Sequence, residues 1–319
     1  MRKHLAFVLF IIFTLLLSFS LFACRTEDGT DTPDECKVEF TDALGRTVSV
    51  SKNPERVAAL LGSFADVWQL AGGELCAAAD DAWEDFGLSL DSAVNLGGAH
   101  SPSLELLISS NPDFVIASAS TKSNLEMLSP LEDLGITVAY FDVDSFSDYL
   151  NMLDILTEIT ERRDLYEKNG ILIKKEIELI KSEFQNSGLT ENERKILLVR
   201  VSSTAVKAKS SVGTILGEML ADIGCINIAD SDTSLLENLS VEKIMKEDPY
   251  RIFAVTMGSD TESANKILKA FISENSAWKT LSAVKENRIH VMDKKLFNLK
   301  PNARWAESYR VLYETLVDR

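Results

Sequence analysis

Residues 145–161 read SFSDYLNMLDILTEITE, and this stretch predicts one amphipathic helix near the middle of the chain. Ser145 and Asp148 have the spacing of a capping box, in which two side chains satisfy backbone N–H groups at a helix start. Acidic and amide side chains recur every three or four residues, and apolar side chains cover the remaining surface. A helix with so wide an apolar surface is expected to pack against two bodies. We therefore predict an interdomain helix over residues 145–163, with an ordinary core helix as the alternative.

Short apolar runs alternate with helical patterns on both sides of this stretch, which is typical of a parallel α/β fold. We expect an amino-terminal lobe over residues 37–144 and a carboxy-terminal lobe over residues 164–319. Strands are predicted at residues 56–62, 75–79, 114–117 and 137–141, and at 196–201, 226–229, 252–257 and 289–292. Helices are predicted at residues 64–71, 102–109, 165–184, 214–223, 241–247, 262–272, 277–285 and 302–317.

One internal repeat links the two lobes. Residues 103–117 read SLELLISSNPDFVIA and residues 240–254 read SVEKIMKEDPYRIFA, at a constant offset of 137 residues. Each copy predicts a capped helix, a proline where helix gives way to strand, and a buried strand. Such units also resemble one another by chance in α/β proteins, so the repeat alone does not decide whether the two lobes are related.

The first residues have the pattern of a secretion signal. Arg2 and Lys3 precede a long apolar run that ends in Leu-Phe-Ala-Cys, which predicts a signal peptide over residues 1–23. The ending resembles the lipobox of bacterial lipoproteins, in which Cys24 becomes the lipidated N-terminus. An uncleaved transmembrane anchor is the alternative.

Charge excludes one large class of function. Loss of residues 1–23 removes two positive charges and takes the formal net charge from −16 to −18. A chain with this negative charge repels nucleic acid, and the sequence contains no basic cluster that would offset the repulsion. We therefore expect no nucleic-acid partner. Residues 24–36 are polar and charged, which predicts a flexible tether between the anchor and the folded part.

Cysteine and histidine are too few for a metal cluster built from them. Cys36, Cys76 and Cys225 are odd in number and lack CxxC spacing, so buried free thiols are expected rather than zinc ligands or a disulfide framework. His100 and His290 are the two histidines left after removal of the signal, so a three-histidine site is excluded. No metal site is predicted.

Several segments, in order over residues 38–317, resemble the substrate-binding proteins of ABC importers for iron siderophores, haem and cobalamin. They are TDALGRTVSV at 41–50, PERVAAL at 54–60, NLGGAHSPSLELLISSNPDFVIASAS at 95–120, LGITVAYFD at 134–142, SENSAWKTLSAVKENRIHVMD at 273–293 and KPNARWAESY at 300–309. The resemblance implies two Rossmann-like α/β lobes joined by a single long interdomain helix, with a ligand cleft between the lobes and little hinge motion. It also implies a monomer outside the cell membrane, held there by its lipid, that passes a small-molecule metal chelate to an ABC transporter permease dimer. No intrinsic cofactor is expected, and the transported ligand would be an iron chelate.

Ligands of open α/β sheets bind beyond the carboxyl ends of the strands, so the loops after the strands hold the predicted ligand-binding residues. Aromatic side chains there would form apolar walls, and cations would pair with anionic groups; packing within the protein is the alternative for each. The candidates are Ser63, Phe64, Trp83, His100 and Ser118 in the first lobe, and Lys209, Met257, Lys300 and Arg304 in the second.

The resemblance also implies that one acidic residue on each lobe docks onto basic residues of the permease. Glu105 and Glu242 occupy the matching places, and they are equivalent under the repeat. Both carboxylates are therefore expected on one face of the molecule. The alternative is that each is a first-turn glutamate that stabilises its own helix.

The sequence narrows the ligand only partly. Residues 80–85, DDAWED, suit a cationic or metal-bearing ligand if the carboxylates point inward, and the loops at Ala99 and Ser118 lack the aromatics expected of cobalamin binders. Haem is an alternative ligand, because His100 and Met257, on opposite lobes, have side chains of the types that ligate haem iron. An extracytoplasmic enzyme is disfavoured, because no GxSxG, GxGxxG, P-loop or HExxH motif is present.

Overall fold

The computed structural model describes residues 36–231, 235–236, 240–257 and 261–318. The predicted signal peptide, Cys24 and all of the predicted tether except its last residue lie outside these ranges. Residues 36–319 form one compact unit. Among the described residues, no helix is both long enough and apolar enough to cross a membrane.

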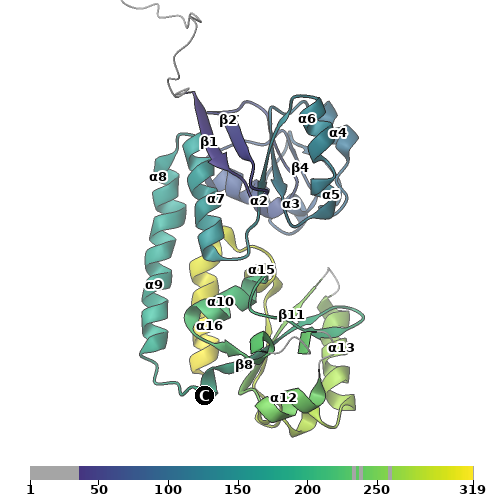
Figure 1. Cartoon of the computed structure of the whole chain (residues 1–319), viewed down its shortest axis with the longest axis vertical. Coiled ribbons are helices and arrows are strands. Elements are labelled where there is room, and N and C mark those ends of the chain that lie inside the picture. The colour runs from purple at the N-terminus through teal and green to yellow at the C-terminus, as the bar shows by residue number, and fades with distance from the viewer. Residues whose placement is uncertain (1–35, 232–234, 237–239, 258–260, 319) are drawn as a thin grey trace, which may run out of the picture. The chain divides into compact units, whose positions relative to one another are not determined.

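The first lobe is built around a parallel sheet with the order β5-β4-β3-β6-β7 (Figure 1). The prediction of parallel α/β structure is confirmed here, and β7 has the predicted ends. An antiparallel hairpin, β1 (Lys37–Thr41) and β2 (Thr47–Ser51), precedes the sheet and was not predicted. The sheet strands are β3 (Val57–Ala59), β4 (Ala77–Ala78), β5 (Val94–Asn95), β6 (Phe114–Ser118) and β7 (Thr137–Phe141).

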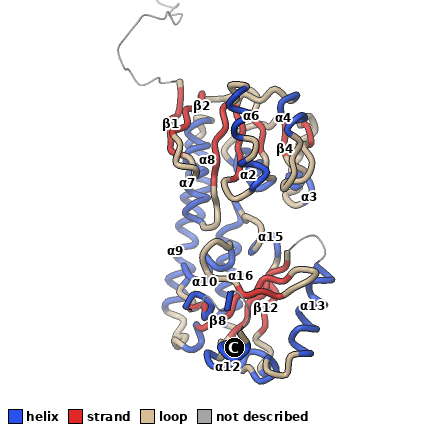
Figure 2. Tube along the Cα trace, turned by 45° about the vertical axis from the view of Figure 1, so that its right-hand side comes forward, coloured by secondary structure: helices blue, strands red, loops and turns tan. Residues whose placement is uncertain are grey.

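The second lobe contains a sheet with the order β10-β8-β11-β12, also parallel, and Figure 2 shows the strands of the two sheets as separate groups among helices. A short strand, β9 (Val206–Ala208), runs antiparallel to β8 and was not predicted. The parallel strands are β8 (Lys195–Val201), β10 (Ile226–Asn227), β11 (Arg251–Thr256) and β12 (Ile289–Met292).

Helices connect the strands and cover both faces of each sheet. Those of the first lobe are α2 (Gly62–Leu70), α3 (Asp81–Glu84), α4 (Leu104–Ser109), α5 (Lys122–Leu125) and α6 (Leu128–Asp133). Those of the second lobe are α10 (Ile215–Ile223), α12 (Val241–Glu247), α13 (Thr261–Glu274), α14 (Ser282–Lys285), α15 (Lys294–Phe297) and α16 (Trp305–Val317). Short helical turns are η2 (Asn192–Arg194), η3 (Ile228–Ser231), η4 (Trp278–Thr280) and η5 (Asn302–Arg304).

The internal repeat predicts a capped helix, a proline and a strand twice. The structure contains the helix and the strand in both copies, but the cap hydrogen bond is present at Ser103 and not at Ser240 among the described residues. Helix α4 begins after Ser103 and α12 begins after Ser240. The residues before the two prolines, Asn111 and Asp248, are also equivalent, and both have a left-handed backbone with φ of 49° and 38°. Each repeat then enters a central strand, because β6 lies between β3 and β7 as β11 lies between β8 and β12.

The helix predicted in the middle of the chain is α7 (Phe146–Ile159), and its capping box is present. The Ser145 hydroxyl accepts a hydrogen bond from the backbone N–H of Asp148 at 3.2 Å, and the Asp148 carboxylate accepts one from the backbone N–H of Ser145 at 2.9 Å. Its apolar sides pack against α2 and β1 of the first lobe and against the start of α16.

The helix that joins the lobes follows α7 in the chain, which corrects the predicted range of residues 145–163. After Glu161, whose φ is 54°, the chain reverses and runs through α8 (Arg163–Tyr166), the π-helical turn η1 (Glu167–Ile171) and α9 (Leu172–Gln185) (Figure 1). Its beginning contacts the first lobe, where the Asn169 side chain donates to the Leu70 carbonyl at 2.8 Å. Its end contacts the second lobe, where Lys181 pairs with Asp222 at 2.5 Å. The width of the apolar surface of α7 is explained by its burial between α2 and α16.

The inner layers of the two lobes form one hydrophobic core. Phe114 of the first sheet and Phe253 of the second belong to the same buried cluster, together with side chains from α7, α9 and α16. Trp305 is fully buried, and its ring centroid lies 5.9 Å from that of Phe146 and 6.4 Å from that of Tyr149. The outer face of each sheet has a separate smaller core. Opening the lobes would therefore expose shared apolar surface.

A buried asparagine also connects the carboxy-terminal segment to the first lobe. Asn302 is fully buried, and its side-chain amide donates to the Ser63 carbonyl and to the Asp66 carboxylate, both at 2.8 Å. Burial raises the pKa of Asp66, and the hydrogen bond from Asn302 opposes that rise. Asn302 has a φ of 51°, which asparagine tolerates better than most residues.

We expect Asn302→Ala to lower the free energy of unfolding by about 2 to 4 kcal/mol, because it removes two buried hydrogen bonds, one of them to a carboxylate, and strains the backbone. Asn287→Ala is the control, since Asn287 has a similar φ of 55° but is exposed. Urea unfolding measures both variants. Equal losses for the two would show that backbone strain accounts for the effect and that the buried hydrogen bonds contribute nothing.

Candidate ligand-binding site

Three of the predicted ligand-binding residues lie in the protein interior. Ser63, Phe64 and Ser118 are 6%, 0% and 1% exposed. The Phe64 ring packs edge-on against Phe141, and the Ser118 hydroxyl shares a hydrogen bond with Ser120. The packing of α2 and β6 covers these three side chains in this structure, and their contact with a ligand stays a prediction.

Trp83 and His100 remain at the surface of the first lobe. Trp83 lies half-buried on α3, directly after the carboxyl end of β4, and His100 is exposed in the loop after β5. Met257, which follows β11 in the second lobe, is 43% exposed. These three side chains stay candidates for ligand contact.

The second lobe gathers three cations on the β8–β9 hairpin. Arg200 and Lys207 are cross-strand partners, and Lys209 lies two residues further along on the same face. Burial, followed by the nearby charges of Arg200 and Lys207, lowers the pKa of Lys209. The Nε atom of Arg200 is buried and has no hydrogen-bond partner among the described residues. We call Arg200, Lys207 and Lys209 the hairpin cations.

Only Lys209 of this group was predicted. Arg200 interrupts the apolar run that follows Lys195 in KILLVRV, and Lys207 and Lys209 alternate in VKAK. Charged residues at alternating positions of a hairpin share one face of it. That alternation is the signal that could have found the other two, but β9 had not been predicted.

A carboxylate links these cations to Lys300. Asp144 follows β7, and burial raises its pKa while Lys300 and Arg200 oppose that rise. Burial lowers the pKa of Lys300, and Asp144 is the largest opposing charge. The Lys300 ammonium lies 5.8 Å from the centre of the Phe64 ring. Phe64 therefore supports a cation beneath the surface instead of forming a wall.

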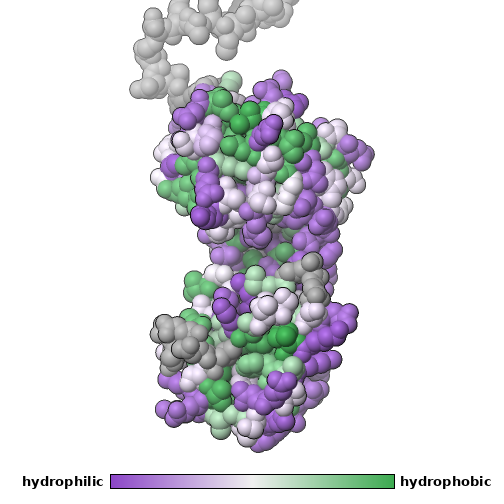
Figure 3. Space-filling view, turned by 90° about the vertical axis from the view of Figure 1, so that its right-hand side faces the viewer, coloured by the Kyte–Doolittle hydropathy of each residue, from purple (hydrophilic) through white to green (hydrophobic). Residues whose placement is uncertain are grey.

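A pocket of about 270 Å³ lies next to Lys300, and both lobes line it. Asp66 and Asp85 come from the first lobe, and Lys300 and Arg304 come from the second. Arg304 is exposed and forms a bidentate ion pair with Glu307, with both distances 2.7 Å. Figure 3 shows the surface hollowed between the two lobes.

The acidic loop at residues 80–85 is engaged with the protein. Asp81 accepts a hydrogen bond from the backbone N–H of Gly62 at 2.8 Å, and Asp85 pairs with Lys294 at 3.2 Å. A Cβ atom at position 62 would lie 2.4 Å from the Ala82 nitrogen, so this close packing requires glycine. The expected preference for a cationic ligand loses support, because two of the carboxylates already have partners.

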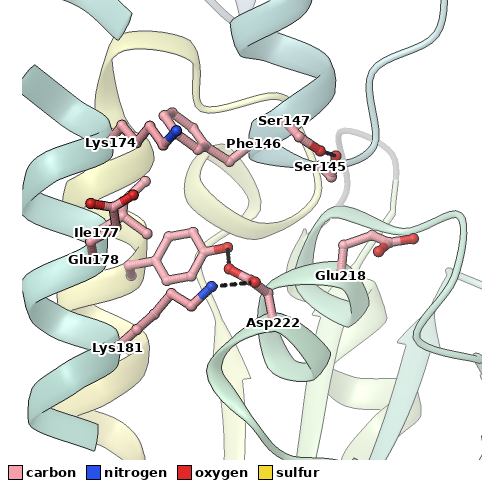
Figure 4. Close-up of a pocket in the computed structure, with 10 residues that line it drawn as sticks. Ser145, Phe146, Ser147, Lys174, Ile177, Glu178, Lys181, Glu218 and Asp222 are labelled. Atoms are coloured by element: carbon pink, nitrogen blue, oxygen red, sulfur yellow. Dashed lines mark hydrogen bonds and ion pairs between the residues drawn. The ribbon is translucent and has the colours of Figure 1, made fainter. Parts of the chain in front are cut away.

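A second pocket, of about 330 Å³, lies on the helical side and contains none of the predicted ligand-binding residues (Figure 4). Lys181 and Tyr309 both bond to Asp222 there, at 2.5 and 2.7 Å. Because these side chains come from α9, α16 and α10, the polar network joins the connecting helix to the second lobe.

The three cysteines among the described residues are free, as expected. Cys36 is exposed, which corrects the prediction that all three thiols are buried. Cys76 and Cys225 are partly buried. Burial raises the pKa of the Cys225 thiol to about 12, so this thiol is protonated at neutral pH.

Asp81 gives the site region a pH-dependent stability. Burial raises the pKa of Asp81 to about 6. Between pH 4 and 6 the folded protein holds a proton there that the unfolded chain releases, so this group's contribution to stability falls as pH rises. Asp81→Asn keeps the acceptor for Gly62 and removes the charge. We expect the variant to be more stable than wild type by about 1 to 3 kcal/mol above pH 7, with no difference near pH 4.

Thermal unfolding between pH 4 and 8 measures this difference. Asp91→Asn, which changes an exposed carboxylate of the same lobe, is the control and should follow wild type. A constant difference between Asp81→Asn and wild type across the pH range would contradict the assignment.

Comparison with known proteins agrees with this architecture. The chain is 25% identical over 311 residues, 92% of each chain, to "Putative ABC transporter substrate-binding lipoprotein YhfQ" of Bacillus subtilis. It is 30% identical over 267 residues to the Fe(3+)-citrate-binding protein YfmC of Bacillus subtilis, covering 79% of this chain and 77% of YfmC.

A solved structure shows the same fold. Staphylococcus aureus SirA complexed with staphyloferrin B aligns with a TM-score of 0.65 at 18% identity, covering 88% of this chain and 98% of SirA. The family model for periplasmic binding proteins matches residues 57–296, which include both sheets. The protein therefore belongs to the periplasmic binding protein family, whose members bind substrates for transport and are not enzymes.

Proposed function

We propose that this protein captures an anionic ferric chelate outside the cytoplasmic membrane and delivers it to the permease of an ABC importer. The observation that carries this proposal is the group of hairpin cations, in which the buried Nε atom of Arg200 lacks a partner within the part of the chain that the structure describes. A buried unpaired donor is costly, and an anionic ligand would satisfy it.

The charges of the site favour a ligand that presents oxygen anions. Arg200 and Lys209 supply donors for charge-assisted hydrogen bonds to carboxylates, and Lys300, outside the hairpin, adds another cation close to Asp144. Ferric ion bound by carboxylates or hydroxycarboxylates forms complexes of this kind. The name of YfmC, a relative with 30% identity, points to ferric citrate as the first ligand to test.

Haem is the second candidate, because His100 and Met257 both have exposed side chains on opposite lobes. The same cations would then pair with its carboxylate groups. Cobalamin remains a third candidate without a specific contact in its favour.

Titration of the purified protein with ferric citrate, ferric siderophores, haem and cobalamin, followed by tryptophan fluorescence, tests the ligand class. We expect Arg200→Gln and Lys209→Gln each to weaken binding of the ferric chelate by about 10- to 100-fold, because each removes a charge-assisted hydrogen bond.

Lys195→Gln is the matched control, since Lys195 lies at the amino end of the same strand as Arg200 and its variant loses the same charge. Unchanged affinity in the Arg200 and Lys209 variants would remove the hairpin cations from the site. If the wild type binds haem and none of the other ligands tested, haem would replace the ferric chelate as the proposed ligand.

We further propose that the protein is a monomer whose acidic residues Glu105 and Glu242 dock onto basic residues of the permease. Both side chains are exposed in the first turn of equivalent helices, α4 and α12. Their equivalence within the repeat supports docking over a purely helix-stabilising role.

We also propose that Cys24 carries a lipid that anchors the protein to the membrane, with residues 24–36 as the tether. Acyl chains bind membranes through their buried methylene groups. We expect Cys24→Ala to shift the protein from the membrane fraction to the soluble fraction, whereas Cys36→Ala, which changes an exposed free thiol, should leave it membrane-bound. Mass spectrometry of the wild type that finds an uncleaved, unmodified N-terminus would refute the anchor.

A further inference from the structure

Two exposed apolar side chains occupy the same place in the two copies of the repeat. Ile108 on α4 is 37% exposed, and Met245 on α12 is 45% exposed. They are separated by the repeat offset of 137 residues. Each follows a proposed docking glutamate, Glu105 or Glu242, by three residues.

The helix geometry places each apolar side chain beside its glutamate. Residues three apart on a helix are neighbours on one face. Between them, Leu107 and Ile244 are 0% and 1% exposed and fix which face of each helix points inward. The outward faces of α4 and α12 therefore present the same pair, a carboxylate next to an aliphatic or thioether side chain.

We infer that these pairs are two composite contacts, which we call the repeat patches, and that Ile108 and Met245 insert into apolar sockets of the permease. This inference rests on the proposed function and adds the residues that supply most of the affinity. A chain that shows one patch twice fits a partner with two like sockets, as a symmetric dimer provides. The acidic and apolar halves of each patch call for a socket with an apolar floor and a basic rim.

The relative strengths of the two contacts follow from their chemistry. An exposed ion pair changes affinity by about fivefold at most. Burial of an aliphatic side chain that is partly exposed in the free protein is worth about tenfold, and this gain does not fall with salt. The apolar halves of the patches should therefore dominate binding, while the carboxylates set its orientation and its rate.

Uptake by cells and photocrosslinking test the inference together. Cells that produce Ile108→Ser with Met245→Ser should take up radiolabelled ferric citrate at least tenfold more slowly at subsaturating concentration, while the purified variant binds ferric citrate as wild type does. Benzoylphenylalanine placed at position 108 or 245 in the full-length protein should crosslink, in intact cells, to an integral membrane protein of the importer.

Leu179 is the matched control position, because it is 65% exposed on α9 and lies outside the repeat. Leu179→Ser should leave uptake unchanged, and a crosslinker at position 179 should give no such adduct. Wild-type uptake by the double serine variant, or absence of the membrane adduct from positions 108 and 245, would overturn the inference.

Glutamate variants separate this inference from the proposed function. If Glu105→Gln with Glu242→Gln lowers uptake while the double serine variant does not, the result supports docking by the glutamates and refutes the apolar sockets. If the wild type neither binds nor imports ferric citrate, the proposed ligand is refuted. The crosslinks from positions 108 and 245 then provide the test of the repeat patches.

Discussion

The packing of Trp305 between the lobes is the contact on which the arrangement of the two sheets depends. Trp305 begins α16, a helix that lines the inner face of the second lobe, yet its ring packs on Phe146 and Tyr149 of α7. Asn302, three residues earlier, reaches Ser63 and Asp66 in the first lobe. The carboxy-terminal segment thus returns to the first lobe. Since these contacts belong to one core, the lobes cannot separate widely without losing a large apolar surface.

This shared core has a direct effect on the electrostatics between the lobes. It holds Lys300, Asp144 and Arg200 in partly buried positions where water cannot fully solvate them, which is why burial is the main cause of their shifted pKa values. A flexible surface would let such side chains turn outward and regain solvent. The rigid frame instead keeps cations and one carboxylate close to one another, an arrangement typical of sites that are organised before the ligand arrives.

The sequence predicted regular elements best where one local signal settles the structure. The capping box fixed the start of α7, and the apolar run in TVAYF fixed β7. Errors came where local patterns depend on distant partners. The apolar sides of α7 indicated a bridge between lobes, but the bridge is α8 to α9, because the same pattern arises when a helix is buried by α2 and α16. The loop position of Phe64 gave no sign that its ring packs against Phe141. The cations Arg200 and Lys207 were missed because only the pairing of β8 with β9 brings them together.

The repeat has a consequence for orientation. A surface that carries the same pattern twice can be seated on a two-fold symmetric receptor in two ways, which differ by half a turn. The rest of the molecule is not symmetric, because the first sheet is parallel throughout the described residues while β9 runs antiparallel in the second. The two seatings would therefore place the hairpin cations over opposite halves of the receptor. The copies themselves are not identical, because Ile108 corresponds to Met245 within the patches and, beside them, Leu106 corresponds to Lys243 and Ser109 to Lys246. For a protein that docks as proposed, delivery either proceeds equally well in both orientations, which doubles the number of productive encounters, or is directed by these differences between the copies.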